Sequence, residues 1–376
     1  MNLKFLLLTI LLLTACNQAP KAPEEHPILS KKDSLVPPEE KLSFEDSINL
    51  DTIWLICAGD IMPASNFNGN YLPRKEGKQL FTDLVPHIQA ADIAFGNFEG
   101  VLADSGLTDK KCYDPKFCYR FRIPLVYADR LKEAGFDLLN IACNHIDDFG
   151  RKGRRVTEKN LYAKGFWVAG LKHRPCIQFE KDGLVYGFCA FAPFSGCFGM
   201  RDTAAIAHEI RQLAPLCDVV IVSLHGGAEG SDHRHVTRED EVFLGFNRGN
   251  MYEVAHIAID AGADVIIGTG PHVVRALELY KNRLIMYSLG NFCTYGLFAL
   301  NEYTGYAPLM RVGLNKRGDF LAAQIIPIKQ IKKLGTRFDP EGIAIQQLRE
   351  LTEEDFLDGQ LKVFANGWVY GMTNGE

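Results

Sequence analysis

Short runs of apolar residues recur along the chain, and each one ends in a cluster of polar residues. The runs are TIWLICA from Thr52, ADIAFG from Ala91, FDLLNIAC from Phe136, CDVVIVSL from Cys217 and ADVIIG from Ala263. Nearly continuous apolar runs of this length predict strands that are buried on both faces, as in a parallel sheet. Helical patterns lie between the runs, and this alternation predicts an α/β fold.

The expected elements cover most of the chain from residue 52 onward. Strands are expected near 52–58, 92–96, 137–143, 166–169, 176–180, 184–191, 217–224 and 263–268, and helices near 78–90, 124–134, 151–164, 203–214 and 248–261. After His272, two hairpin patterns follow, ALELYKNRLIMYSLGNF and APLMRVGL with FLAAQIIPI. The change of pattern predicts a two-sheet αββα sandwich with mixed sheets over residues 51–332, and a C-terminal extension without chemistry over 333–376.

The first fifty residues predict a membrane-anchored leader and not part of the fold. Lys4 precedes the apolar run Phe5–Leu13, and the string LTAC that ends at Cys16 resembles the bacterial lipobox. Residues 1–15 are therefore expected to be a lipoprotein signal peptide, with lipidation at Cys16; an ordinary secretory signal is the alternative. Residues 16–50 are expected to form a disordered tether, because prolines and charges dominate them. This predicts a lipid-anchored protein of the cell envelope that faces the periplasm or the cell exterior.

Charge and cysteine content narrow the partners and the compartment. The formal net charge of −5 gives no reason to expect nucleic-acid binding. Cys112 and Cys118 flank a polar stretch and are a possible disulfide in an oxidising compartment. Four other cysteines lie in or beside apolar strands and are expected to be buried thiols: Cys57, Cys143, Cys189 and Cys217.

The polar clusters at the strand ends carry the candidate chemistry. They are Gly59-Asp60, Asn97-Phe98-Glu99, Asn144-His145, His225 to Glu229, and Gly270-Pro271-His272. Taken singly, each is equally well explained by a turn, a helix cap or a buried histidine. Because ligands bind beyond the carboxyl ends of strands in open α/β sheets, the clusters are expected to meet at one edge. Carboxylate, amide and imidazole groups suit hard or borderline divalent metals, so a metal centre for hydrolysis is predicted.

Several motifs in order resemble the bacterial CapA family of capsule and poly-γ-glutamate biosynthesis proteins. They are GDIM, GNFE, NIACNHIDDFG, LHGGAE and GTGPHV followed by YSLGNF. That family is similar to calcineurin-like metallophosphoesterases. The resemblance implies one or two ions of Mn, Fe or Zn, and metal-binding positions at Asp60, Glu99, Asn144, His225 and His272. It also implies that His145 assists the leaving group.

Two positions depart from the metallophosphoesterase pattern. Met62 and Thr269 stand where those enzymes often have histidines, so a mononuclear site is an alternative to a dinuclear one. His233 and His235 are possible substitutes, or members of a solvated loop.

Further roles are assigned from spacing and charge. Glu229 is expected to orient a ligand or water, and Arg122 and Arg275 are candidates to hold an anionic substrate, although arginines without such a role are equally common. The expected function is a metal-dependent hydrolase that acts on an anionic polymer, its precursor or a phosphoester, with membrane capsule-synthesis subunits as partners. The alternative is a non-catalytic subunit that binds or assembles the polymer.

Overall fold

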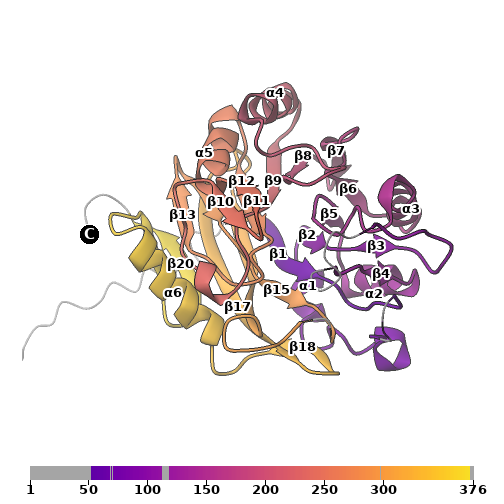
Figure 1. Ribbon diagram of the computed structural model, residues 1–376. Helices are drawn as coiled ribbons and strands as arrows, with labels where there is room; N and C mark the ends of the chain where they lie inside the picture. Colours follow the sequence, from indigo (N-terminus) through magenta and orange to yellow (C-terminus); the bar gives the residue numbers. More distant parts are fainter. Residues whose placement is uncertain (1–51, 68, 70, 112–117, 297, 373–376) are drawn as a thin grey trace, which may run out of the picture. The chain divides into compact units, whose positions relative to one another are not determined.

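The computed structural model describes residues 52–67, 69, 71–111, 118–296 and 298–372. Two large sheets carry most of its strands, and helices lie outside them (Figure 1). The expectation of a mixed two-sheet α/β sandwich is confirmed by this strand pairing. The predicted signal peptide 1–15, the tether 16–50 and the lipidation site Cys16 lie outside the described residues.

The larger sheet has ten strands and is parallel on one side only. Its order is β19 (Leu361–Val363), β20 (Trp368–Gly371), β17 (Phe320–Ile331), β16 (Tyr306–Leu314), β1 (Ile53–Ile61), β2 (Ile93–Phe98), β5 (Leu138–Asn140) and β6 (Trp167–Ala169), with β15 (Asn291–Cys293) on β1 and β18 (Gly335–Phe338) on β17. Strands β1, β2, β5 and β6 run parallel, so their carboxyl ends lie at one edge.

The smaller sheet has six strands, and its four central strands are parallel. Its order is β13 (Leu277–Tyr280), β14 (Arg283–Met286), β12 (Val265–Thr269), β9 (Val219–His225), β8 (Leu184–Phe191) and β7 (Cys176–Lys181). Two short ribbons complete the strands: β3 (Val101–Leu102) with β4 (Arg122–Ile123), and β10 (Glu241–Phe243) with β11 (Phe246–Gly249).

The core has two main parts, which correspond to the layers of the sandwich. The larger cluster joins apolar residues of both sheets, and the rings of Phe95 on β2 and Phe188 on β8 meet at 5.9 Å. The second cluster lies between the smaller sheet and two helices, where Ile206 and Val254 are buried. The helices are α1 (Val85–Gln89), α2 (Val126–Ala134), α3 (Gly150–Ala163), α4 (Thr203–Leu213), α5 (Met251–Ala261) and α6 (Ile343–Asp355). Burial of this apolar area is the main stabilising contribution to the fold.

Two expected helices are shorter than predicted, for local reasons. The helix expected near 78–90 is reduced to α1, because Pro86 has no backbone N–H and occurs only in the first turn of a helix. The helix expected from residue 248 begins at Met251, since residues 246–249 form β11 and Asn250 caps α5 by accepting from the Glu253 N–H.

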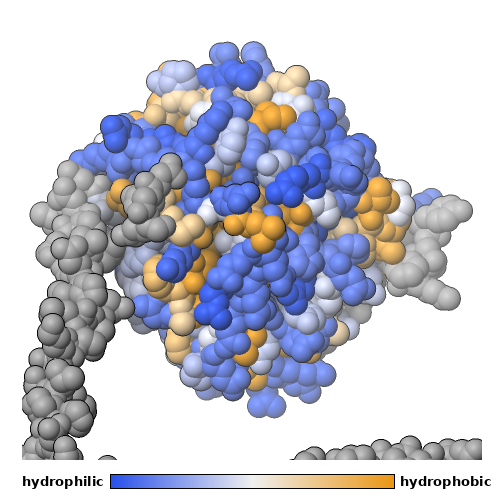
Figure 2. Space-filling model, turned by 90° about the vertical axis from the view of Figure 1, so that its left-hand side faces the viewer, coloured by the Kyte–Doolittle hydropathy of each residue, from blue (hydrophilic) through white to orange (hydrophobic). Residues whose placement is uncertain are grey.

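The segment 333–376, set apart as an extension, contributes strands to the larger sheet. Strand β18 pairs with β17, and β20 pairs with both β17 and β19. Helix α6 packs beside this edge on the left of Figure 1. The face in Figure 2 is mostly hydrophilic, with hydrophobic residues in small separate patches.

The cysteines differ in one respect from expectation. Cys189 is not a free thiol, because it forms a disulfide with Cys176 across the β7–β8 pair. Cys57, Cys143 and Cys217 are free thiols; the first two are buried and Cys217 is partly buried. Cys118 is disulfide-bonded, whereas Cys112 lies outside the described residues. Across the part of the chain that the structure describes, no helix has both the length and the apolar character needed to cross a membrane.

Candidate metal centre

The two sheets deliver their polar strand ends to a common site. From the larger sheet, Asp60 lies near the end of β1, Glu99 directly follows β2, and Asn144 lies in the loop after β5. From the smaller sheet, His225 is the last residue of β9 and His272 follows β12. These side chains meet because the parallel strands of both sheets end on the same side of the sandwich.

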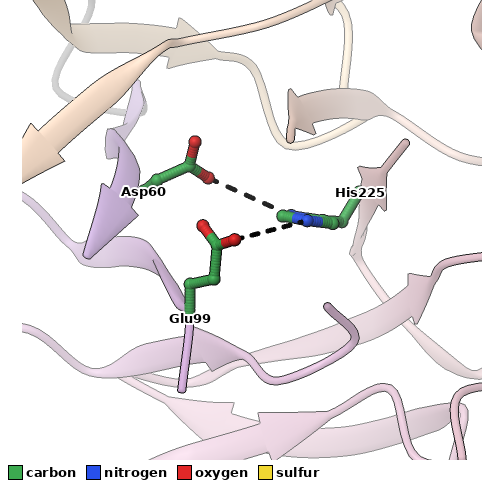
Figure 3. Close-up of side chains that lie close together, drawn as sticks. All are labelled: Asp60, Glu99 and His225. Carbon is green, nitrogen blue, oxygen red and sulfur yellow. Dashed lines mark ion pairs between the residues drawn. The ribbon is translucent and has the colours of Figure 1, made fainter. Parts of the chain in front are cut away.

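Asp60, Glu99 and His225 form the centre of the site (Figure 3). One ligand atom from each lies within 4.8 Å of the other two, and all three side chains are buried. His225 Nδ1 is 4.0 Å from Asp60 Oδ1, and His225 Nε2 is 3.9 Å from Glu99 Oε1. Such separations suit ligands that share one ion, because each metal–ligand bond is about 2.0–2.2 Å long.

His272 and Asn144 extend this group. His272 Nδ1 is 2.9 Å from Asp60 Oδ2, and its Nε2 is 3.8 Å from Glu99 Oε1. Asn144 Oδ1 lies 3.2 Å from His225 Nε2. His272 has φ +60°, a backbone conformation that residues with a Cβ rarely adopt and that recurs at functional sites. The Nε2 atoms of both histidines therefore face the same oxygen of Glu99.

The carboxylate of Glu99 has an unmet requirement. Both of its oxygens are buried, and neither has a hydrogen-bond partner among the described residues. Burial raises the pKa of this carboxyl well above its usual value; His272 lowers it and Asp60 raises it again. A buried carboxylate is unfavourable unless a proton, a hydrogen-bond donor or a cation compensates its charge. The donor set of carboxylates, imidazoles and an amide oxygen fits a divalent cation of the Mn, Fe or Zn type.

The two histidines differ in their electrostatic surroundings. Burial lowers the pKa of His225 to about 3, and Asp60 only partly opposes this. For His272, burial also lowers the pKa, but Glu99 and Asp60 outweigh it and raise the value to about 10. Without a cation, the excess negative charge of the two carboxylates thus attracts a proton to His272.

A ring of amide and hydroxyl groups orients the ligand candidates. Asn97 Nδ2 donates to Asp60 Oδ1 at 2.7 Å and lies 3.1 Å from His225 Nδ1, while Asn97 Oδ1 accepts from Asn140 Nδ2 at 2.8 Å. Thr269 Oγ1 lies 3.0 Å from His225 Nδ1. Groups that fix the far side of a metal-ligating imidazole set its tautomer and orientation. Thr269 therefore replaces a potential ligand with a positioning group.

His145 lies beside this site on the same loop as Asn144. Its Nδ1 is 2.9 Å from Asp148 Oδ2, and its ring packs against Phe121 at 4.2 Å. Asp148 is buried and also accepts from the Phe121 N–H at 2.7 Å. The described residues offer no hydrogen-bond partner to His145 Nε2, so this atom is the one available to a substrate.

The arginine and Glu229 assignments fare differently from one another. Arg275 is fully buried, and Glu241 pairs with both of its terminal nitrogens at 2.7 Å. This placement leaves its guanidinium no access to a substrate, so the suggested substrate contact is not supported. Arg122 donates to Asn66 Oδ1 and packs over Phe67, away from the ligand candidates. Glu229 is paired with Arg248 at 2.8 Å.

The two spare histidines do not join the group. His235 is exposed and pairs with Asp355, and the backbone carbonyl of His233 accepts from Arg275 Nε. Met62, at the other departure from the phosphoesterase pattern, is fully buried.

Other polar residues contact or adjoin the site without having been singled out from the sequence. Asn291 Oδ1 lies 3.0 Å from His272 Nδ1, and its position in the YSLGNF motif was an available indication. Asp148 lies in the NHIDDFG motif, directly after the Asn-His pair. Arg248 packs over Phe194, whose ring lies 5.9 Å from that of His225. No sequence pattern pointed to Arg248, because only the β10–β11 ribbon brings it there.

Comparisons with known proteins agree with these motifs. A capsule biosynthesis protein CapA of Bacillus anthracis is 28% identical over 264 residues, which cover 64% of this chain and 60% of that protein. A PGA biosynthesis protein CapA of Bacillus subtilis is 27% identical over 261 residues, covering 64% and 63%. The chain thus matches about three-fifths of the length of these relatives.

A solved structure of a putative 5'-nucleotidase from Staphylococcus aureus aligns with a TM-score of 0.43 at 15% identity, covering 82% of this chain and 59% of that one. The sandwich architecture itself is established by the strand pairing of this chain. The family described as "Bacterial capsule synthesis protein PGA_cap" matches residues 54–295, which is more than half of the chain. The protein therefore belongs to this family of bacterial capsule synthesis proteins.

Proposed function

We propose that this protein is a metal-dependent hydrolase of capsule or poly-γ-glutamate-type polymer synthesis, acting on a phosphoester or an anionic polymer precursor. The observation that carries the proposal is Glu99, whose two buried oxygens lack partners between the imidazoles of His225 and His272. A fold gains nothing from such an arrangement, because burying an unpaired carboxylate destabilises it. A cation-binding role accounts for it.

Five side chains would hold the cation: Asp60, Glu99, Asn144, His225 and His272. A divalent cation there supplies Lewis-acid polarisation of a phosphoryl or carbonyl oxygen and makes water more acidic. Arg248 adds a positive charge near the site, and it is held by Glu229. Its contribution would be to attract and orient an anionic group.

His145 would act on the leaving group. Its Nδ1 donates to Asp148 Oδ2, which fixes the ring and leaves Nε2 to hold a proton and pass it to the departing oxygen. Asp148 in turn is held by the Phe121 N–H and Lys110. Asp148 is therefore a positioning residue for His145.

The proposed location is the outer side of a membrane, through a lipid on Cys16, and membrane subunits of a polymer synthase are the proposed partners. The LTAC string and the proline-rich segment after it support the anchor. The Cys176–Cys189 disulfide also supports a compartment outside the cytosol, because such bonds persist in oxidising surroundings.

The test combines metal analysis with a substrate panel on the purified full-length chain. Reconstitution with Mn²⁺, Fe²⁺ or Zn²⁺ should leave a roughly stoichiometric amount of metal on the protein. Turnover should appear on a panel of phosphoesters and γ-linked glutamate polymers. The variant His145→Ala should lose about 10²–10⁴-fold in turnover while keeping its metal, as expected for a lost proton donor. His87→Ala, at an exposed histidine, is the matched control.

Two results would contradict the proposal in different ways. A chain that retains none of these metals has no metal centre of the kind described. Bound metal without turnover on the panel, together with tight polymer binding, would instead favour the non-catalytic role of a polymer-binding or assembly subunit.

A further inference from the structure

A basic pocket lies beside the candidate metal centre, on the first turns of α3. Its volume is about 750 Å³, and its walls come from α3 and from two loops of the chain. We call it the α3 pocket, and its lining residues are Arg151, Arg154, Arg155, Glu158, Leu171, Lys172, His173, Ser195 and Gly196. Four of these nine carry a fixed positive charge and one is acidic, whereas the whole chain has a net charge of −5. The positive charge is therefore concentrated locally.

Three of the cations in the α3 pocket are uncompensated. Arg154 pairs with Asp147, and Glu158 is shared by His173 and Arg174. The side chains of Arg151, Arg155 and Lys172 are exposed, and among the described residues none of them has an ion pair or a hydrogen bond. Cations of one sign gathered in a concave site focus the potential and attract anions.

The α3 pocket is continuous with the metal centre through both of its walls. On the α3 side, Arg154 pairs with Asp147, which lies three residues after the ligand candidate Asn144. On the loop side, Ser195 follows Phe194, whose ring packs 5.9 Å from His225 and under the guanidinium of Arg248. An extended ligand that reaches the metal centre therefore has a positively charged path toward the α3 pocket.

We propose that the α3 pocket is an anion subsite that binds further oxyanions of a polyanionic substrate while its reacting bond lies at the metal centre. This inference rests on the proposed function of that centre. Arginine and lysine recognise carboxylate and phosphate oxygens alike, so the ligand chemistry is a flexible chain with closely spaced oxyanions. Several weak contacts along one chain add up, since after the first contact the others form intramolecularly.

The experiment measures binding of two polyanions to the full-length, metal-reconstituted protein. Fluorescently labelled poly-γ-glutamate supplies carboxylates and inorganic polyphosphate supplies phosphates, and fluorescence anisotropy gives the affinity of each. The triple variant R151Q/R155Q/K172Q should bind at least one of the two about tenfold more weakly, if each exposed contact contributes about two- to threefold. The comparison of the two arms identifies the oxyanion. Raising the salt concentration should reduce the difference between variant and wild type, because the contacts are exposed.

A matched control removes the same number of positive charges elsewhere. Arg74, Lys75 and Lys78 are exposed on the 3₁₀ turn Arg74–Gly77 and its cap, so R74Q/K75Q/K78Q alters the net charge equally without touching the α3 pocket. Its affinity for both polymers should equal that of the wild type. The single variants Arg151→Gln and Arg155→Gln, each at an exposed position, should retain the wild-type melting temperature and show the smaller separate losses.

The outcomes separate this inference from the proposed function. Equal loss of polymer affinity in the triple variant and in the control would overturn the subsite, and so would no loss in either, even if the protein holds metal and turns over a small phosphoester. Failure to bind metal would overturn the proposed hydrolase while the affinity difference still reports on the α3 pocket. Metal content and small-ester turnover should be unchanged in the triple variant, because none of its three residues contacts a ligand candidate.

Discussion

Two buried acidic residues of this protein have opposite surroundings. Glu241 accepts from Arg275 through both oxygens at 2.7 Å and also from the Ala228 N–H at 2.8 Å. Glu99 is just as inaccessible, yet neither of its oxygens has a hydrogen-bond partner among the described residues. Both are carboxylates taken out of water, but only the first is compensated within the chain.

The difference distinguishes a structural charge from a ligand-binding one. Arg275 also donates to the carbonyls of His233 and Ala228, so the Arg275–Glu241 pair ties the loop after β9 to the β10–β11 ribbon. Glu99 instead faces two imidazole nitrogens at 3.8 and 3.9 Å, which is too far for hydrogen bonds and suitable for a shared ion. Satisfaction of the buried charge, and not burial alone, separates the two roles.

The largest effect is expected from breaking the satisfied pair. Arg275→Met should lower the free energy of unfolding by about 3–5 kcal/mol, because it leaves Glu241 buried without its cation. Urea unfolding measured by circular dichroism gives the value. The double variant Arg275→Met/Glu241→Gln should recover part of the loss, since the uncompensated charge is then gone.

An exposed ion pair provides the control for this prediction. Lys281 and Asp260 are paired at the surface, and Lys281→Met should cost less than about 1 kcal/mol. If Arg275→Met cost no more than Lys281→Met, the Arg275–Glu241 pair would not be structural, and the contrast with Glu99 would be lost.

The opposite behaviour is expected at Glu99. Glu99→Gln keeps the size of the side chain and removes its charge, so the metal-free variant should be as stable as the wild type or more stable. With the cation at 100 times its dissociation constant, the wild type should gain about 2.7 kcal/mol and the variant should gain almost nothing. Thermal unfolding with and without Mn²⁺ or Zn²⁺ measures both quantities.

Glu180 is an exposed residue of β7 and serves as the matched position. Glu180→Gln should respond to metal as the wild type does. A metal-free Glu99→Gln protein that is several kcal/mol less stable would mean that Glu99 supports the fold, which contradicts the proposed metal centre.

Much of this arrangement follows from local sequence, and the rest does not. The apolar runs locate β1, β2, β9 and β12, and strand direction then brings Asp60 and Glu99 to one edge. The Arg275–Glu241 pair could not be predicted, because no pattern connects two residues that are 34 positions apart. The β10–β11 ribbon was missed for a similar reason, since its short strands carry exposed apolar residues and lack a buried face.

The Cys176–Cys189 disulfide was within reach of sequence reasoning. The paired strands 176–180 and 184–191 were expected, and Asp182-Gly183 between them is a two-residue turn of the type that fixes hairpin register. Lys181 then pairs with Leu184, and the same register sets Cys176 opposite Cys189. What was lacking was the step from a turn type to a residue pairing.

The smallest expected effect concerns Thr269, which tests whether the groups around the centre orient its ligands. When His225 donates from Nδ1 to Thr269 Oγ1, its Nε2 keeps a lone pair directed toward Glu99. Thr269→Val has nearly the same shape but cannot accept this bond, so metal affinity should fall about tenfold, the low end for such positioning groups, because Asn97 still contacts Nδ1. Thr269→Ser keeps the hydroxyl and should bind metal as the wild type does. Competition with a chromogenic chelator measures all three affinities, and equal losses in the valine and serine variants would show that packing at this position, and not the hydroxyl, governs His225.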